Sequence, residues 1–295
     1  MRLSFRDFMV IYLVLISFPI GAQEQTPDGG VVYFLRNHNI WVHDLKSGQG
    51  RQITHDKKIS TYTVSHSGNQ IAYALDDGQL YILDLIDNKE TLFLKKTSLA
   101  DPSFSPKDDQ LVFTCSVPDD PYFLSNTFGF VYHIWLLDIK TKKAIDLTES
   151  RYHHINAKWS PDGKWLSYSA MVDPWWTMFR DVPWEIYLMN VNDKKDLAIK
   201  IGKGKDSKWV DSKRLFISDN RLFKVYDVQT RAVVKEFNID DPCSGDYSFG
   251  PTMETIYYQA FCGGEGERPV IKMFDLKSRK KKELIFDGEN PLYVK

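Results

Sequence analysis

The chain has 295 residues, of which 43% are apolar and 26% are charged, so it can bury a core, and this composition excludes a disordered protein. Its 38 Lys and Arg residues balance 39 Asp and Glu residues. The net charge of −1 argues against a dedicated nucleic-acid-binding protein, which needs a surplus of basic side chains, and we expect no nucleic-acid partner.

Residues 1–22 have the pattern of a secretory signal peptide. Two arginines precede an apolar run over 8–18, and Gly21 and Ala22 provide the small residues of a cleavage site. The run is short for a bilayer-spanning helix, and an uncleaved membrane anchor is the alternative interpretation. We expect cleavage after Ala22 and a periplasmic or secreted protein, without stable membrane insertion, that consists of residues 23–295.

One sequence phrase recurs about every 46 residues and predicts a repeat architecture. It is a short strand of alternating apolar residues that ends in Asp, or once in Asn. We expect this last side chain to cap the turn that follows. The six copies are 40–44, 80–84, 134–138, 186–190, 223–227 and 271–275.

A second phrase precedes these copies and predicts a β-hairpin. Its fullest example, residues 157–168, has Ser160-Pro161-Asp162-Gly163 between two short apolar runs. Pro presets the backbone of a turn, Ser and Asp cap it, and Gly accepts a positive φ. Together the two phrases make units of four strands, so the sequence predicts an all-β, six-bladed β-propeller.

The two ends of the mature chain complete one blade. Residues 26–34 match the turn and second strand of a blade whose first strand is missing, and 290–294 resemble the innermost strand at 101–105. We expect the C-terminal strand to join the first blade and close the ring, which leaves few exposed sheet edges. This arrangement makes 23–295 a single propeller domain.

The Ser160-Pro161-Asp162-Gly163 turn, the neighbouring Trp159 and the recurring strand-end Asp resemble the WD-like repeats of the TolB-type six-bladed propellers. The resemblance covers nearly the whole mature chain and implies a periplasmic protein. TolB itself has an additional N-terminal α/β domain. Few residues separate the cleavage site from the first blade here, so we do not expect a direct role in the Tol–Pal envelope system.

Two long loops between strands are rich in aromatic residues, and their blades are neighbours. They span residues 116–132 and 171–184. The aromatic side chains form either a small satellite core or an exposed patch that binds a partner. The candidate partner-binding residues are Tyr122, Phe123, Phe128, Trp175, Trp176, Phe179 and Trp184.

His153 and His154 enter the fourth blade, where we expect them at the mouth of the central channel. Adjacent histidines do not readily bind one ion, so we interpret them as hydrogen-bonded residues and predict no metal site and no cofactor. We find no nucleophile elbow, zinc-protease motif or P-loop, and we assign no catalytic residue.

The three cysteines are Cys115, Cys243 and Cys262. If Gly250 lies opposite Thr255 in the hairpin of the sixth blade, the same register places Cys243 opposite Cys262. We predict a disulfide between these two residues, although a shift of register by one residue would prevent it. Cys115 is then a buried free thiol.

The function expected from these features is that of a non-catalytic scaffold that binds an envelope protein through its loop face. The alternative is a carbohydrate-binding or carbohydrate-active propeller, of glycosidase or lyase type, that holds a glycan at the channel mouth. A purely structural role in a larger assembly is a third reading. A propeller fold alone does not decide among them.

Overall fold

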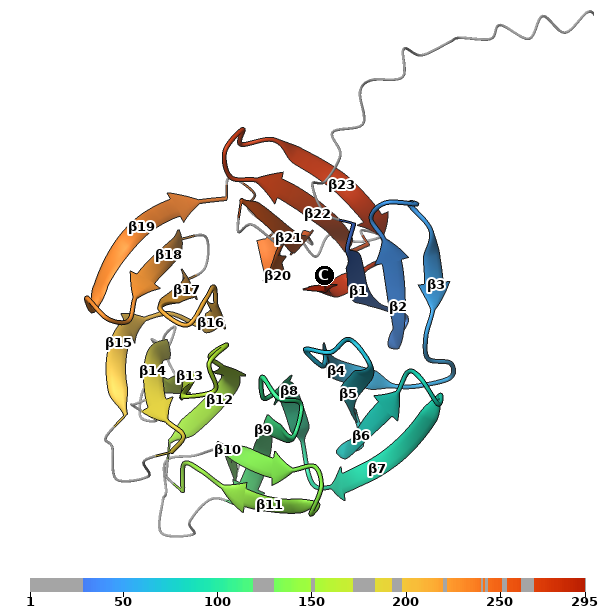
Figure 1. The fold of residues 1–295 in the computed structure, drawn as a ribbon, viewed down its shortest axis with the longest axis vertical. Helices are drawn as coiled ribbons and strands as arrows, with labels where there is room; N and C mark the ends of the chain where they lie inside the picture. The colour runs from blue at the N-terminus through green and yellow to red at the C-terminus, as the bar shows by residue number, and fades with distance from the viewer. Residues whose placement is uncertain are drawn as a thin grey trace, which may run out of the picture.

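The fold is a ring of six four-stranded antiparallel β-sheets around a central channel (Figure 1). This confirms the predicted six-bladed propeller. In the part of the chain that the structure describes, no helix has the length and apolar character that crossing a membrane would require. The computed structural model describes residues 29–118, 130–149, 152–171, 184–192, 198–219, 222–239, 241, 244–250, 254–260 and 268–294.

Each of the first three blades has four strands, with the innermost strand at the channel and the fourth strand at the outer edge. From the centre outward, their strands are β24 (Glu289–Val294), β1 (Val31–Arg36), β2 (Asn39–Asp44) and β3 (Gly50–Gln52); β4 (Ile59–Val64), β5 (Gln70–Leu75), β6 (Gln79–Asp84) and β7 (Lys89–Lys95); and β8 (Leu99–Phe104), β9 (Gln110–Pro118), β10 (Phe130–Asp138) and β11 (Lys143–Asp146).

The remaining three blades repeat this order. Their strands are β12 (His153–Trp159), β13 (Trp165–Met171), β14 (Trp184–Asn190) and β15 (Ile199–Lys203); β16 (Asp206–Trp209), β17 (Arg214–Asp219), β18 (Leu222–Asp227) and β19 (Ala232–Asn238); and β20 (Ser244–Phe249), β21 (Thr255–Ala260), β22 (Val270–Asp275) and β23 (Lys281–Phe286).

The C-terminal strand closes the ring, as predicted. β24 pairs antiparallel with β1, with Val31 opposite Val294. The guanidinium of Arg36 reinforces the junction between the first and last blades. It donates to the carbonyl oxygens of Phe286, at 2.6 Å, and Asp287, at 3.3 Å, and it lies 5.1 Å from the centre of the Trp41 ring.

The predicted turn chemistry is present in the hairpins. In three of them a Ser hydroxyl accepts a hydrogen bond from the backbone N–H five residues later, and these serines are Ser65, Ser105 and Ser160. Gly68 and Gly163 have the positive φ that the turn needs, at 74° and 71°. Asp108 takes the same place in the third blade with a φ of 57°. Its carboxylate accepts two backbone hydrogen bonds from the neighbouring blade's turn, from His66 and Ser67.

The residue that ends each repeat caps the following turn in all six blades. In each case a side-chain oxygen accepts a hydrogen bond from a backbone N–H two or three residues later. These residues are Asp44, Asp84, Asp138, Asn190, Asp227 and Asp275.

The core lies between the blades and consists of six separate apolar clusters, one at each junction of neighbouring sheets. At the junction of the last two blades, for example, the Phe216 and Phe249 rings meet edge to face with their centres 4.5 Å apart. Such pairs stabilise a junction beyond the area that they bury. The rigid ring that results holds the six inner strands at fixed positions around the channel.

Cys115 lies in β9 as a buried free thiol, as predicted, and burial raises its pKa to about 11. Cys243 and Cys262 lie outside the described residues. The register that we assumed for their hairpin holds from Gly250 to Tyr247, which lies opposite Tyr258. A bulge then shifts the pairing by one residue, so the predicted disulfide depends on strand positions beyond this bulge.

Candidate functional site

The inner strands alternate in exposure along their length, and this alternation forms the channel wall. In β8, for example, Asp101 and Ser103 are partly exposed, whereas Pro102 and Phe104 are buried against neighbouring blades. Six strands in the same position therefore present two successive layers of side chains to the channel. The first layer consists of Thr61, Asp101, Asn156, Asp206, Asp246 and Asn290, and the second of Thr63, Ser103, Lys158, Lys208, Ser248 and Leu292.

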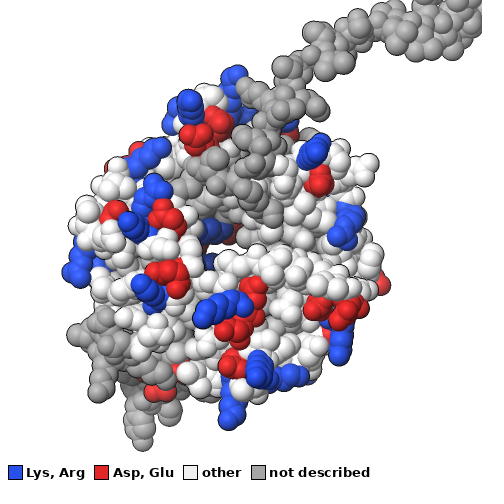
Figure 2. Space-filling model, in the orientation of Figure 1, with Lys and Arg blue, Asp and Glu red and all other residues white. Residues whose placement is uncertain are grey.

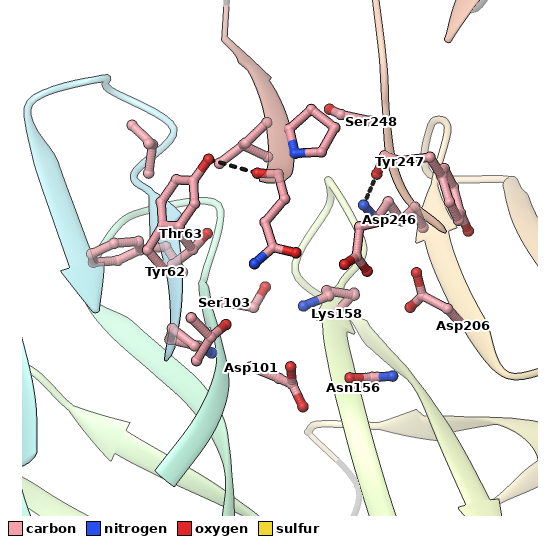
Figure 3. A pocket seen from close by; sticks show the side chains of 18 of the residues that line it. Tyr62, Thr63, Asp101, Ser103, Asn156, Lys158, Asp206, Asp246, Tyr247 and Ser248 are labelled. Carbon is pink, nitrogen blue, oxygen red and sulfur yellow. Dashed lines mark hydrogen bonds between the residues drawn. The ribbon is translucent and has the colours of Figure 1, made fainter. Parts of the chain in front are cut away.

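These layers enclose a cavity of about 940 Å³ at the centre of the ring. Figure 2 shows its opening, with basic and acidic side chains inside it. In Figure 3 the side chains of Asp101, Asn156, Lys158, Asp206 and Asp246 point from four inner strands into the same space. The cavity is thus lined by groups of both charges.

The charged groups of the two layers come from the third to sixth blades, whereas the first and second blades contribute uncharged side chains. On the uncharged side, the Tyr62 hydroxyl donates to the carbonyl oxygen of Asn290 at 2.8 Å, which links β4 to β24. The cavity therefore has one charged wall and one neutral wall.

Asp101 is held by neighbouring side chains. Thr114 donates to its carboxylate at 3.4 Å, and in the amide orientation that satisfies both groups Asn156 donates to its two oxygens at 3.2 and 2.8 Å. Burial raises the pKa of the Asp101 carboxyl, and the Lys158 ammonium opposes this rise. Burial also raises the pKa of Asp206, opposed first by Lys208 and then by Lys158.

The two channel lysines differ in their contacts. The Lys208 ammonium donates to the carbonyl oxygen of Tyr247 and lies 4.5 Å from the centre of its ring, and burial lowers the pKa of this lysine. The Lys158 ammonium, in contrast, has no carboxylate within 4.0 Å among the described residues. Nor does any described group donate a hydrogen bond to the Asp246 carboxylate or pair with it. Among the charged residues of the two layers that the structure describes, Lys158 and Asp246 are therefore the two without such a contact; Lys205 also lines the cavity but lies outside the two layers.

Of the candidate site residues singled out from the sequence, those that the structure describes do not line the cavity. Of the aromatic candidates, Trp184 begins β14, where it is half-buried, lies opposite Met171, and accepts a backbone hydrogen bond from Gly204 at 2.9 Å. Tyr122, Phe123, Phe128, Trp175, Trp176 and Phe179 lie outside the described residues.

His153 and His154 lie at the beginning of β12, and neither lines the cavity, in contrast to Asn156 and Lys158 of the same strand. The Nδ1 atom of His153 accepts a hydrogen bond from the backbone N–H of Tyr132 at 3.3 Å. His154 is buried, with its ring edge-on to Tyr168 at 5.5 Å between centres. Both histidines therefore contribute to blade packing.

The pH dependence of stability is expected to reflect His154. Burial, reinforced by the nearby His133 and His153, lowers its pKa to about 4 from 6.5, and Asp146 opposes the shift only in part. Between these values the unfolded chain binds the proton and the folded chain does not, so stability falls as pH drops from 6.5 toward 4. The expected loss is about 3 kcal/mol.

Urea unfolding of wild type and His154→Gln across this pH range measures the effect. The variant is expected to show a flatter dependence on pH. His66→Gln is the matched control, because it makes the same substitution at a histidine whose side chain is 52% exposed. Equal slopes in wild type and His154→Gln would show that His154 is not the responsible group.

The channel residues were not identified from the sequence, although a signal is present. In four blades a large aromatic residue is preceded by two polar residues, one of them one position earlier and the other three positions earlier. Trp159, for instance, follows Lys158 and Asn156, and Trp209 follows Lys208 and Asp206. We interpreted this phrase only as hairpin chemistry. Its polar positions line the channel because the strand that carries them is the innermost one.

Among the described residues, no group of three or more His, Cys, Asp or Glu side chains is arranged to hold a metal ion. The three channel carboxylates come from three different inner strands, and Lys158 acts electrostatically on both Asp101 and Asp206. The described channel is therefore suited to a ligand that carries charges of its own.

Comparison with known proteins supports the fold. No family model matches the chain. A curated relative, an uncharacterised peptidase YuxL of Bacillus subtilis (strain 168), is 26% identical over 183 residues. The match covers 51% of this chain and spans only 27% of the relative's length.

Solved structures cover more of the chain. TolB from Acinetobacter baumannii superposes with a TM-score of 0.65 at 18% identity, over 90% of this chain and 66% of that protein. A chain of a nidogen/laminin complex gives 0.67 at 9% identity, over 90% and 99%. An oligogalacturonate lyase in complex with manganese gives 0.54 at 14% identity, over 83% and 69%. The chain thus has a TolB-like propeller fold, and these identities establish the fold alone.

Proposed function

We propose that this chain is an exported binding protein of the bacterial envelope that holds a protein partner at its central channel. The main support is that two charged side chains of the cavity wall, Lys158 and Asp246, have no ion-pair partner among the described residues. Lys158 is half-buried and Asp246 is exposed to the channel, and the ring packs through its apolar clusters without either group. A ligand that supplies the opposite charges accounts for both.

Three further observations support a protein ligand outside the cytoplasm. The leader pattern over 1–22 favours export. One structural neighbour of almost the same extent comes from a nidogen/laminin complex, which is an assembly of proteins. The aromatic residues of 116–132 and 171–184 are the types that anchor protein interfaces, and we propose that they extend the contact surface beyond the channel.

Site-specific photocrosslinking in the native envelope tests this proposal. A photoreactive amino acid at Ser103, in the channel wall, is expected to give a discrete protein adduct. The same group at Val233, which is 49% exposed on the outer strand β19, is the matched control and is expected to give none. An adduct of equal yield at both positions, or at Val233 alone, would contradict a partner held at the channel.

A glycan ligand is the second candidate, because carboxylates from three blades line a deep cavity. Carboxylates that flank a sugar can act as acid and base in glycoside cleavage. Incubation with oligogalacturonate and with neutral oligosaccharides tests this alternative. Turnover that Asp206→Asn abolishes would favour the enzyme, whereas unchanged substrates leave the protein-binding proposal in place.

A further inference from the structure

We propose that the channel recognises an extended polypeptide segment in which a basic and an acidic side chain are two residues apart. The basic side chain pairs with Asp246 and the acidic side chain pairs with Lys158. This inference rests on the proposed function, because it specifies which feature of a protein partner enters the channel.

The charges of the channel wall are ordered along the ring axis. Carboxylates and amides occupy the first layer of the channel wall, and both lysines occupy the second layer. Each inner strand follows the outer strand of the preceding blade along the chain, so all six run in the same direction across the ring. The layers therefore keep their order around the whole ring, and the channel is negative at one level and positive at the next.

Most of the charged groups in the two layers already have a partner and are not available to a ligand. Asp101 already accepts hydrogen bonds from Asn156 and Thr114, and Asp206 accepts one from the backbone of Ser207 at 2.8 Å. Lys208 is held by Tyr247. Of the charged residues in the two layers, as far as the structure describes them, Lys158 in the second layer and Asp246 in the first remain without such contacts.

The spacing of the two layers matches the repeat of an extended peptide. Residues two apart in a strand are separated by about 7 Å and lie on the same side. An extended peptide has the same repeat, so its side chains at positions i and i+2 match the two layers. The Lys158 and Asp246 side chains come from β12 and β20 but point into the same space (Figure 3), so one segment along the axis can contact both.

The size of the cavity and the free edges of the inner strands favour a peptide as the ligand. A cavity of about 940 Å³ is far larger than a single ion needs. Each inner strand is the terminal strand of its sheet, and the described part of the chain places no strand on its channel side, so its backbone can hydrogen-bond to a peptide main chain. The neutral wall, which includes Thr61, Thr63 and Leu292, suits the uncharged part of such a segment.

Double-mutant cycles with a blocked peptide test the inference. The probe is acetyl-Gly-Gly-Lys-Gly-Glu-Gly-Gly-amide with a fluorophore, and its analogues replace Glu by Gln or Lys by norleucine. The protein variants are Lys158→Met and Asp246→Asn, each checked for an unchanged melting temperature. Fluorescence anisotropy at low salt measures the affinities, because screening weakens such pairs.

Loss of either charge pair is expected to weaken binding about tenfold. Lys158→Met is expected to weaken binding of the Glu peptide and leave that of the Gln peptide unaffected. Asp246→Asn is expected to weaken binding of the Lys peptide and leave that of the norleucine peptide unaffected. No binding at millimolar peptide, or a Lys158→Met effect of equal size on the Glu and Gln peptides, would overturn the inference. If Ser103 still gave a protein adduct, the proposed function would stand and only the charge rule would fall.

Discussion

Deleting β24, residues 289–295, is expected to remove the cooperative unfolding transition of the propeller. β24 is the inner strand of the first blade, and its loss exposes β1 and the apolar cluster that includes Val32 and Phe34. The cost is expected to exceed about 5 kcal/mol, which is the whole stability of a typical domain. Calorimetry and far-ultraviolet circular dichroism of the truncated protein measure it.

A circular permutant is the matched control for this deletion. It joins Val294 to Gly30 through a Ser-Pro-Asp-Gly turn, which is feasible because Val31 and Val294 are register partners. It opens the chain at Ile86, which is 73% exposed in the turn between β6 and β7. The permutant is expected to unfold cooperatively near the wild-type temperature. A truncated chain as stable as wild type would show that the C-terminal strand does not close the ring.

Asp241→Ala is expected to cost about 3 kcal/mol of unfolding free energy. The buried Asp241 carboxylate accepts a hydrogen bond from the Tyr258 hydroxyl at 3.0 Å and pairs with Lys272 at 3.2 Å. Removing the carboxylate leaves a largely buried ammonium and a buried hydroxyl without this partner. Urea denaturation, with the midpoint and slope both fitted, measures the loss.

Glu283→Ala is the matched control for Asp241→Ala. The Glu283 carboxylate lies 4.0 Å from the same Lys272 ammonium, but its side chain is 55% exposed. An exposed pair of this kind contributes little, so the control is expected to cost less than about 1 kcal/mol. Equal losses in the two variants would mean that burial does not set the strength of this network.

The local parts of the fold could be predicted from the sequence because they depend on residues close together in the chain. The turn at Ser160 and Gly163 follows from hydroxyl capping and a positive φ, both of which act within six residues. The closure of the ring could be predicted as well, since the first blade lacked a strand in sequence and 290–294 matched the missing piece.

The site could not be predicted in the same way, because its contacts join residues from different blades. Asn156 belongs to β12 and Asp101 to β8, yet the two pair across a blade boundary. Whether a lysine is free depends on a carbonyl group of another strand, as the contact of Lys208 with Tyr247 shows. The bulge in β20 shifts the pairing with β21 by one residue, and no sequence motif in that strand predicts it.

Hydrogen–deuterium exchange of the complex with the partner captured at Ser103 tests most directly whether the channel is the binding site. Slower exchange of backbone amides is expected in β8, β12 and β20, which carry Asp101, Lys158 and Asp246. Exchange in the outer strands β7 and β19 is expected to stay unchanged. Protection confined to the outer strands, with the inner strands unaffected, would show that the partner does not bind in the channel.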